Sequence, residues 1–156
     1  MRALVLGLGL LIAQSSWALQ GGENGCYGRG PLEPFELMRP AFFTYEQTCR
    51  IPTLVNDLIM KAHLSEIRSC WGNVLGRYPF QNIELPLAVT VSESRIEVLP
   101  PGENEIPADA MTTDLRKCLV DVIQKIEVPT AQIRAIGGPL PWYMLGTIQF
   151  GYRYKK

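Results

Sequence analysis

The chain has no net charge, a single histidine and no long apolar run, and each shortage excludes a class of protein. Its 156 residues carry 15 Lys and Arg against 15 Asp and Glu, so the formal net charge is zero. Without a basic surplus or a basic run, there is no electrostatic footprint for nucleic acid phosphates. The hydrophobic content of 47% with 19% charged residues argues against intrinsic disorder and fits one ordinary globular domain.

Motifs that carry enzymatic chemistry are missing as well. The chain shows no phosphate-binding loop, no metal-ligand spacing and no nucleophile beside a base. With His63 as the lone imidazole, a zinc site would need ligands from widely separated segments. We therefore expect no catalytic residue, no metal and no cofactor. A hydrolase that uses His63 stays open as an alternative, which a pocket around this side chain would support.

The first eighteen residues are typical of a secretory signal peptide. Arg2 gives a charged start, residues 3–13 form an apolar run, and Ser16 and Ala18 are small residues where signal peptidase reads the chain. The apolar run is shorter than the ~20 residues that span a bilayer, although a retained membrane anchor is the alternative. Cleavage after Ala18 predicts an exported chain that has no membrane association and is periplasmic or extracellular.

Residues 19–52 are rich in Gly and Pro, which interrupt regular structure too often for a long helix or strand. We expect an extended lead segment, with a flexible linker as the alternative. The short apolar runs 35–38 and 41–43 could lie against the folded body. The domain proper is then predicted to cover residues 53–156.

Beyond Pro52, apolar residues recur at steps of three and four and predict an amphipathic helix of about six turns. Thr53 is its expected N-cap, and Gly76 with Pro79 ends it. His63 lies on the apolar face of this helix and is expected to be packed there rather than to act as a ligand or base. The face comprises Val55, Ile59, His63, Ile67, Cys70, Trp71, Val74 and Tyr78.

The rest of the chain predicts a hairpin, a second helix and a last strand. Residues 83–91 alternate apolar and polar as a half-buried strand does, and residues 96–99 follow a turn at 92–95. Pro86 cannot donate to a sheet ladder, which favours a strand at the sheet edge or a bulge.

The second helix covers residues 115–126, with Thr112 or Thr113 as its cap and Pro129 as its stop. The last strand covers residues 145–154. The order helix, strand, strand, helix, strand predicts an α+β fold with two helices on one face of a three-stranded antiparallel sheet.

The four cysteines predict a disulfide framework, because an exported chain meets an oxidising environment. Three pairings are possible, and none of the cysteines forms a C-x-x-C motif. Cys70 and Cys118 each lie on the apolar face of a predicted helix, and both helices must cover the same face of the sheet. We therefore expect Cys70 to pair with Cys118, and Cys26 with Cys49.

Residues 62–71, which include His63, Ile67, Arg68 and Cys70, resemble the opening helix of the AgmX/PglI C-terminal domain. This is a TonB-like domain of bacterial gliding-motility and cell-envelope proteins. The resemblance runs from residue 52 to residue 154 and includes the strand at 85–91, Cys118 and the aromatic closing strand. It implies the TonB C-terminal fold after the lead segment. The glycines that this family places before the first strand and in the hairpin are absent.

The resemblance also implies a function, namely a non-enzymatic module that binds other proteins of the cell envelope, in a motility or transport setting. The alternative is a secreted, disulfide-stabilised effector or inhibitor that acts on another protein. Nucleic acid is not an expected partner.

The last strand is the predicted binding site. In a sheet that follows chain order this strand is an edge without proline, and an unpaired edge is a template for strand addition by an envelope protein or peptide. Aromatic residues often anchor binding surfaces. Pairing with a second copy, as a homodimer, and coverage by residues 19–52 are the alternatives. The expected partner-binding residues are Trp142, Tyr143, Thr147, Gln149 and Arg153.

Overall fold

The computed structural model describes residues 33–78, 82–101 and 109–151. The predicted signal peptide, Cys26 and Arg153 lie outside these ranges. In chain order the elements are β1 (Phe35–Leu37), η1 (Pro40–Phe42), α1 (Tyr45–Asn56), the π-helical η2 (Asp57–Lys61), α2 (Leu64–Leu75), β2 (Ile83–Val91), β3 (Ile96–Val98), α3 (Ala110–Ile123), α4 (Thr130–Ile136) and β4 (Trp142–Phe150). The predicted α+β class is confirmed, and the sheet is antiparallel throughout.

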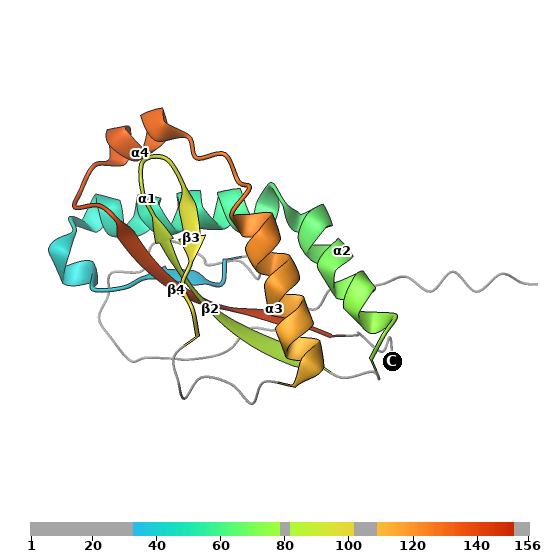
Figure 1. Cartoon of the computed structure of the whole chain (residues 1–156). Coiled ribbons are helices and arrows are strands. Elements are labelled where there is room, and N and C mark those ends of the chain that lie inside the picture. Colours follow the sequence, from blue (N-terminus) through green and yellow to red (C-terminus); the bar gives the residue numbers. More distant parts are fainter. Residues whose placement is uncertain (1–32, 79–81, 102–108, 152–156) are drawn as a thin grey trace, which may run out of the picture.

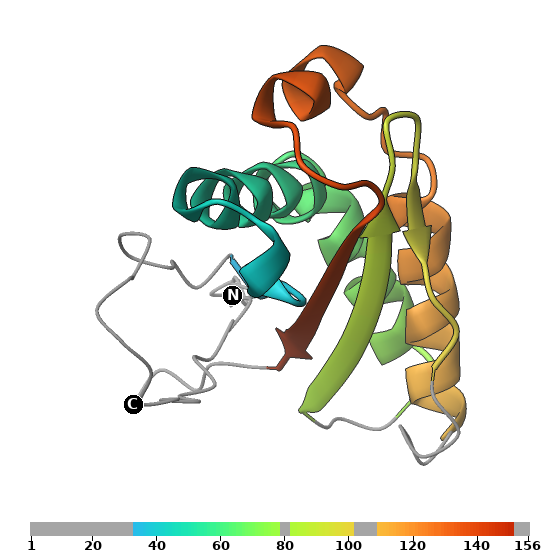
Figure 2. The same ribbon diagram turned by 90° about the vertical axis from the view of Figure 1, so that its left-hand side faces the viewer.

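The sheet has four strands in the order β1-β4-β2-β3, which lie side by side from left to right in Figure 2. β4 therefore lies inside the sheet, and its prediction as an edge strand is wrong. The reason is β1, a piece of the lead segment, which pairs with β4 on the side away from β2. Coverage of β4 by the lead segment was one of the alternatives that the sequence left open.

The helix that was predicted from Thr53 begins earlier, at α1. Thr44 is its N-cap, because the Thr44 hydroxyl accepts the N–H of Gln47 at 3.3 Å while the Gln47 side chain accepts the N–H of Thr44 at 3.0 Å. This reciprocal capping box fixes the start of the helix. Pro52 consequently lies inside α1, buried, instead of in front of the helix.

A π-helical turn joins α1 to α2, and α2 continues at an angle to α1 (Figure 1). The N–H of Ala62 donates to the carbonyl of Asp57 at 2.8 Å, five residues back. Such a turn inserts one residue and rotates the helix face that follows. His63 thereby moves off the apolar face to the N-cap of α2, with its side chain 31% exposed. The expectation that His63 is packed in the core is wrong for this reason.

The second predicted helix also begins earlier than expected, as α3. Asp109 is its N-cap in place of Thr112 or Thr113, since Asp109 Oδ1 accepts the N–H of Thr112 at 2.7 Å. The helix ends at Ile123, before Pro129 is reached. Pro129 instead precedes a short helix, α4, which the sequence did not predict.

The predicted hairpin is present as β2 and β3, and among the described strands the part of β2 that contains Pro86 is an edge, as predicted, while β3 covers the last part of β2. β3 pairs only with residues 89–91, so Pro86 lies in a stretch of β2 that pairs with β4 alone. The Arg116 guanidinium bridges the gap beyond β3, donating to the carbonyls of Pro86 at 3.0 Å and Leu99 at 3.1 Å. A side chain thus satisfies backbone groups with which no described strand pairs.

The hydrophobic core lies between the sheet and α1, α2 and α3. Every second residue of β2, from Ile83 to Val91, points into it, and the facing residues of β4 do the same. The rings of Trp71 and Phe150 stack 5.3 Å apart within this core.

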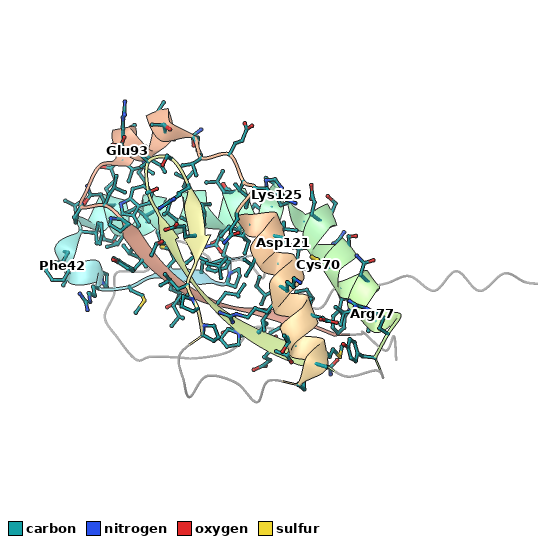
Figure 3. The ribbon with its side chains drawn as sticks, in the orientation of Figure 1. Phe42, Cys70, Arg77, Glu93, Asp121 and Lys125 are labelled. Carbon is teal, nitrogen blue, oxygen red and sulfur yellow. A yellow bond between two sulfur atoms is a disulfide. The ribbon has the colours of Figure 1, made fainter. Side chains whose placement is uncertain are left out.

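The predicted disulfide between Cys70 and Cys118 is confirmed and joins α2 to α3; Cys70 is labelled between these two helices in Figure 3. Cys49 is also disulfide-bonded, and its predicted partner, Cys26, lies outside the described residues.

Candidate functional site: the edge and outer face of β4

The residues of β4 alternate between two faces of the sheet, and the register decides which of them a partner could reach. Trp142, Met144, Ile148 and Phe150 point into the core. The intervening residues point to the opposite side, which we term the outer face of β4. It consists of Tyr143, Leu145, Thr147 and Gln149.

Trp142 is not a binding anchor. Its side chain is completely buried opposite Val91, because the alternation places it on the helix side of the sheet. Within the described part of the chain, the indole Nε1 of Trp142 has no hydrogen-bond partner.

Tyr143, the other aromatic residue expected to bind a partner, lies on the outer face. Its side chain is 48% exposed and Leu145 beside it is 45% exposed. Leu145 was not among the predicted binding residues, although its position two residues from Tyr143 places it on the same face.

Gln149 and Thr147 also lie on the outer face, but they are less accessible than a contact surface would require. Gln149 is only 7% exposed, and its Nε2 donates to Glu84 Oε1 at 3.0 Å across the β2–β4 pair. Thr147 is half-buried opposite Pro86. If a partner binds these two residues, it must therefore bind their backbone groups rather than their side chains.

The backbone edge of β4 is only partly covered. β1 pairs with residues 144–146 and no further. The N–H of Met38 donates to the carbonyl of Tyr143 at 2.8 Å, so the backbone groups of Tyr143 face β1. The backbone N–H and C=O groups of successive residues point to alternate sides along an antiparallel strand. The backbone groups of Thr147 and Gln149 consequently face the same side as those of Tyr143. No strand among the described residues pairs with residues 147–150 on that side, which we term the open edge.

β1 is held on its other side by a buried asparagine of α1. Asn56 Oδ1 accepts the N–H of Phe35 at 3.0 Å, and Asn56 Nδ2 donates to the carbonyl of Phe35 at 2.9 Å. The same Nδ2 donates to the carbonyl of Pro52 at 2.8 Å. Asn56 is only 1% exposed, so these bonds satisfy a polar group that would otherwise be costly to bury.

Gly146 makes room for β1 at the point of closest approach. A Cβ at this position would lie 2.7 Å from Cδ1 of Phe35 and 2.8 Å from the carbonyl oxygen of Pro34. Neither Asn56 nor Gly146 was predicted from the sequence as part of this site. A glycine inside a strand is a signal of close backbone approach, but an isolated asparagine in a helix carries no comparable signal.

The polar groups elsewhere form surface ion pairs. Arg134 of α4 donates to Glu93 at the hairpin tip with Nη2 2.8 Å from Oε2, and this hydrogen bond lowers the pKa of the Glu93 carboxyl. His63 Nδ1 lies 3.7 Å from Glu66 Oε1. The Ser65 hydroxyl donates to Glu66 and lowers the pKa of that carboxyl.

A groove of about 400 Å³ lies between α1 and α4, and His63 is not among the residues that line it. Its lining comprises Cys49, Arg50, Thr53, Leu54, Asp57, Gln132, Ala135 and Ile136. Among the described residues, no cluster of three or more His, Cys, Asp or Glu side chains has an arrangement that could hold a metal ion. In the three described ranges, no helix combines the length and the apolar character that a membrane crossing requires.

Comparisons with protein-family models, curated proteins and solved structures found no match for this chain.

Proposed function

We propose that this chain is a non-enzymatic protein-binding module of the bacterial cell envelope, exported to the periplasm or the cell exterior, that binds an extended segment of a partner protein by strand addition. The observation that carries this proposal is the open edge of β4. Among the described strands, none pairs with residues 147–150 on this side, and unpaired backbone groups at a sheet edge are a template for a further strand.

Two further observations support the proposal. Tyr143 and Leu145 expose large apolar side chains on the outer face next to this edge, where a partner could cover them. The disulfides at Cys70–Cys118 and at Cys49 fit an oxidising compartment. The sequence resemblance to envelope proteins points to the same setting, in a motility or transport assembly.

The test compares two substitutions at Gln149 in the mature chain. Gln149→Pro removes a backbone N–H that faces the open edge and leaves the ladder to β2 intact, because Gln149 and its neighbours alternate in direction. Gln149→Ala removes the hydrogen bond to Glu84 but keeps the N–H. We expect a partner captured from envelope extracts by the wild type to be lost with Gln149→Pro and retained with Gln149→Ala.

Light scattering of the same three proteins identifies self-pairing, which would appear as a wild-type dimer that Gln149→Pro dissociates. A folded Gln149→Pro chain that retains the partner would exclude the open edge as the binding site.

A further inference from the structure

β1 is bound to the rest of the molecule in the way a peptide is bound to a receptor. In Figure 2 it lies between α1 and β4. On one side, the N–H of Phe35 donates to Asn56 Oδ1 at 3.0 Å and the carbonyl of Phe35 accepts from Asn56 Nδ2 at 2.9 Å. Since the Phe35 backbone faces Asn56 and the N–H of Met38 faces β4, alternation directs the Glu36 backbone toward β4. The backbone of β1 is thus hydrogen-bonded on both sides, and none of these contacts depends on which side chains β1 carries.

Side-chain selectivity comes from the position of Phe35. This ring is completely buried, and it lies against Gly146, where any Cβ would approach it to 2.7 Å. A glycine at this position of β4 keeps space for an aromatic side chain and for the backbone in front of it. The position therefore selects an extended segment that carries a bulky aromatic residue opposite Gly146.

β1 uses only part of the edge that this position offers. It has three residues, follows Pro34 and ends before Arg39, whose φ of 55° is left-handed and turns the chain away. Its pairing stops at Gly146, so that no strand among the described residues pairs with the open edge. A partner strand with the same aromatic anchor could pair with both halves of β4 and form backbone hydrogen bonds that β1 cannot form.

We propose that the place of β1, which we term the β1 site, is a binding site for an extended protein segment with an aromatic anchor, and that β1 is its intramolecular occupant. This inference rests on the proposed strand-addition function and specifies the chemistry of the partner. A short strand at a sheet edge belongs to the parts of a fold that open most easily. The partner replaces β1, seats its aromatic side chain against Gly146 and presents its backbone to Asn56.

The test uses a fluorescein-labelled peptide with the sequence of residues 33–38, Glu-Pro-Phe-Glu-Leu-Met, and the full mature chain. Phe35→Ala weakens the intramolecular occupant and leaves the site itself intact. While β1 occupies the site, the peptide can bind only the small fraction of molecules in which β1 has detached, and its apparent affinity is lowered accordingly. We therefore expect the Phe35→Ala chain to bind the peptide about ten-fold or more tightly than the wild type. A peptide with Ala in place of Phe should not bind. Equal affinity of both chains, or of both peptides, would overturn the proposal.

A second variant keeps the test decisive if the Phe35→Ala chain does not fold. Glu36→Pro removes the N–H that β1 directs toward β4 and keeps the aromatic ring, and it too should raise the affinity for the peptide. Gly146→Ala, combined with Phe35→Ala, fills the space against which the peptide ring must lie and should abolish binding. Circular dichroism and the mass of the Cys70–Cys118 bridge confirm the fold of each chain.

The outcomes separate this inference from the proposed function. If Phe35→Ala does not bind the peptide while Gln149→Pro still loses the envelope partner, the β1 site is wrong and the open edge stands. If the peptide binds as expected while Gln149→Pro keeps its partner, the open edge is wrong. A wild-type dimer that Phe35→Ala dissociates, with no peptide bound, would overturn the proposal in favour of a second copy of the chain.

Discussion

Single side chains decide how the lead segment joins the domain. Asn56 binds both backbone groups of Phe35 and the carbonyl of Pro52, and Gly146 leaves the space that Phe35 fills. For His63, in contrast, the backbone decides the position of the side chain. One inserted residue in the π-helical turn moves this histidine from its predicted place in the core to a half-exposed position.

Asn56→Ala should lower the free energy of unfolding by about 2–4 kcal/mol, because the N–H and the carbonyl of Phe35 lose their partner in a buried environment. Urea unfolding followed by circular dichroism measures the difference. Asn73→Ala is the matched control, since Asn73 is exposed on α2 and should change stability by no more than about 0.5 kcal/mol. Equal midpoints for the two variants would contradict the buried role of Asn56.

Helices and strands differ in how far the sequence predicts them. β2 and β3 follow from their alternation, and the Cys70–Cys118 bridge follows from two apolar helix faces that share one side of the sheet. The starts of α1 and α3 were misplaced because the caps at Thr44 and Asp109 lie in segments whose prolines and acidic residues indicate loops.

β1 and α4 lie below the length at which periodicity is readable, with three and seven residues respectively. The position of β4 inside the sheet depends on β1, and for that reason the predicted edge could not be located from the sequence. The faces of Trp142 and Tyr143 could not be predicted, since the predicted strand began at Leu145 and both residues precede it, whereas β4 begins at Trp142.

The bridge between α2 and α3 should contribute substantially to stability. With a sequence separation of 48 between Cys70 and Cys118, the chain-entropy model gives about 4 kcal/mol. We expect Cys70→Ala with Cys118→Ala to lower the free energy of unfolding by about this amount in guanidinium titrations. The double variant is a cleaner comparison than reduction of the wild type, which would also open the bridge at Cys49. An unchanged midpoint would show that α2 and α3 are held by packing alone.

The arrangement of the whole chain places α4 over the hairpin tip, at the top of Figure 1. Arg134 pairs with Glu93 there, and the Thr130 hydroxyl donates to the carbonyl of Glu93 at 2.7 Å. These contacts link the last helix to the β2–β3 hairpin, so that the loop leading into β4 starts from a fixed position.

This link predicts a dependence of stability on pH. Arg134 lowers the pKa of Glu93 in the folded chain, so the stabilising contribution is present above the ordinary pKa of glutamate and is lost as the pH falls through the lowered value. Glu93→Gln should therefore melt at a lower temperature than the wild type near pH 7, and the difference should shrink as the pH falls below the ordinary pKa of glutamate and through the lowered pKa of Glu93. Arg134→Gln should behave alike. A difference in melting temperature that is constant from neutral to acidic pH would contradict this link.

The Cys70–Cys118 bridge also governs how the molecule would bear tension. It closes a covalent ring that contains β2 and β3, while β4, the strand proposed to hold the partner, lies outside the ring and pairs with β2 inside it. A tensile force on a bound partner is transmitted from β4 through the β2–β4 pair to this ring, whose residues cannot extend while the disulfide is intact. Since the two cysteines are separated by 48 positions in the sequence, an oxidised chain stretched to its limit is shorter by about 160 Å than a reduced one.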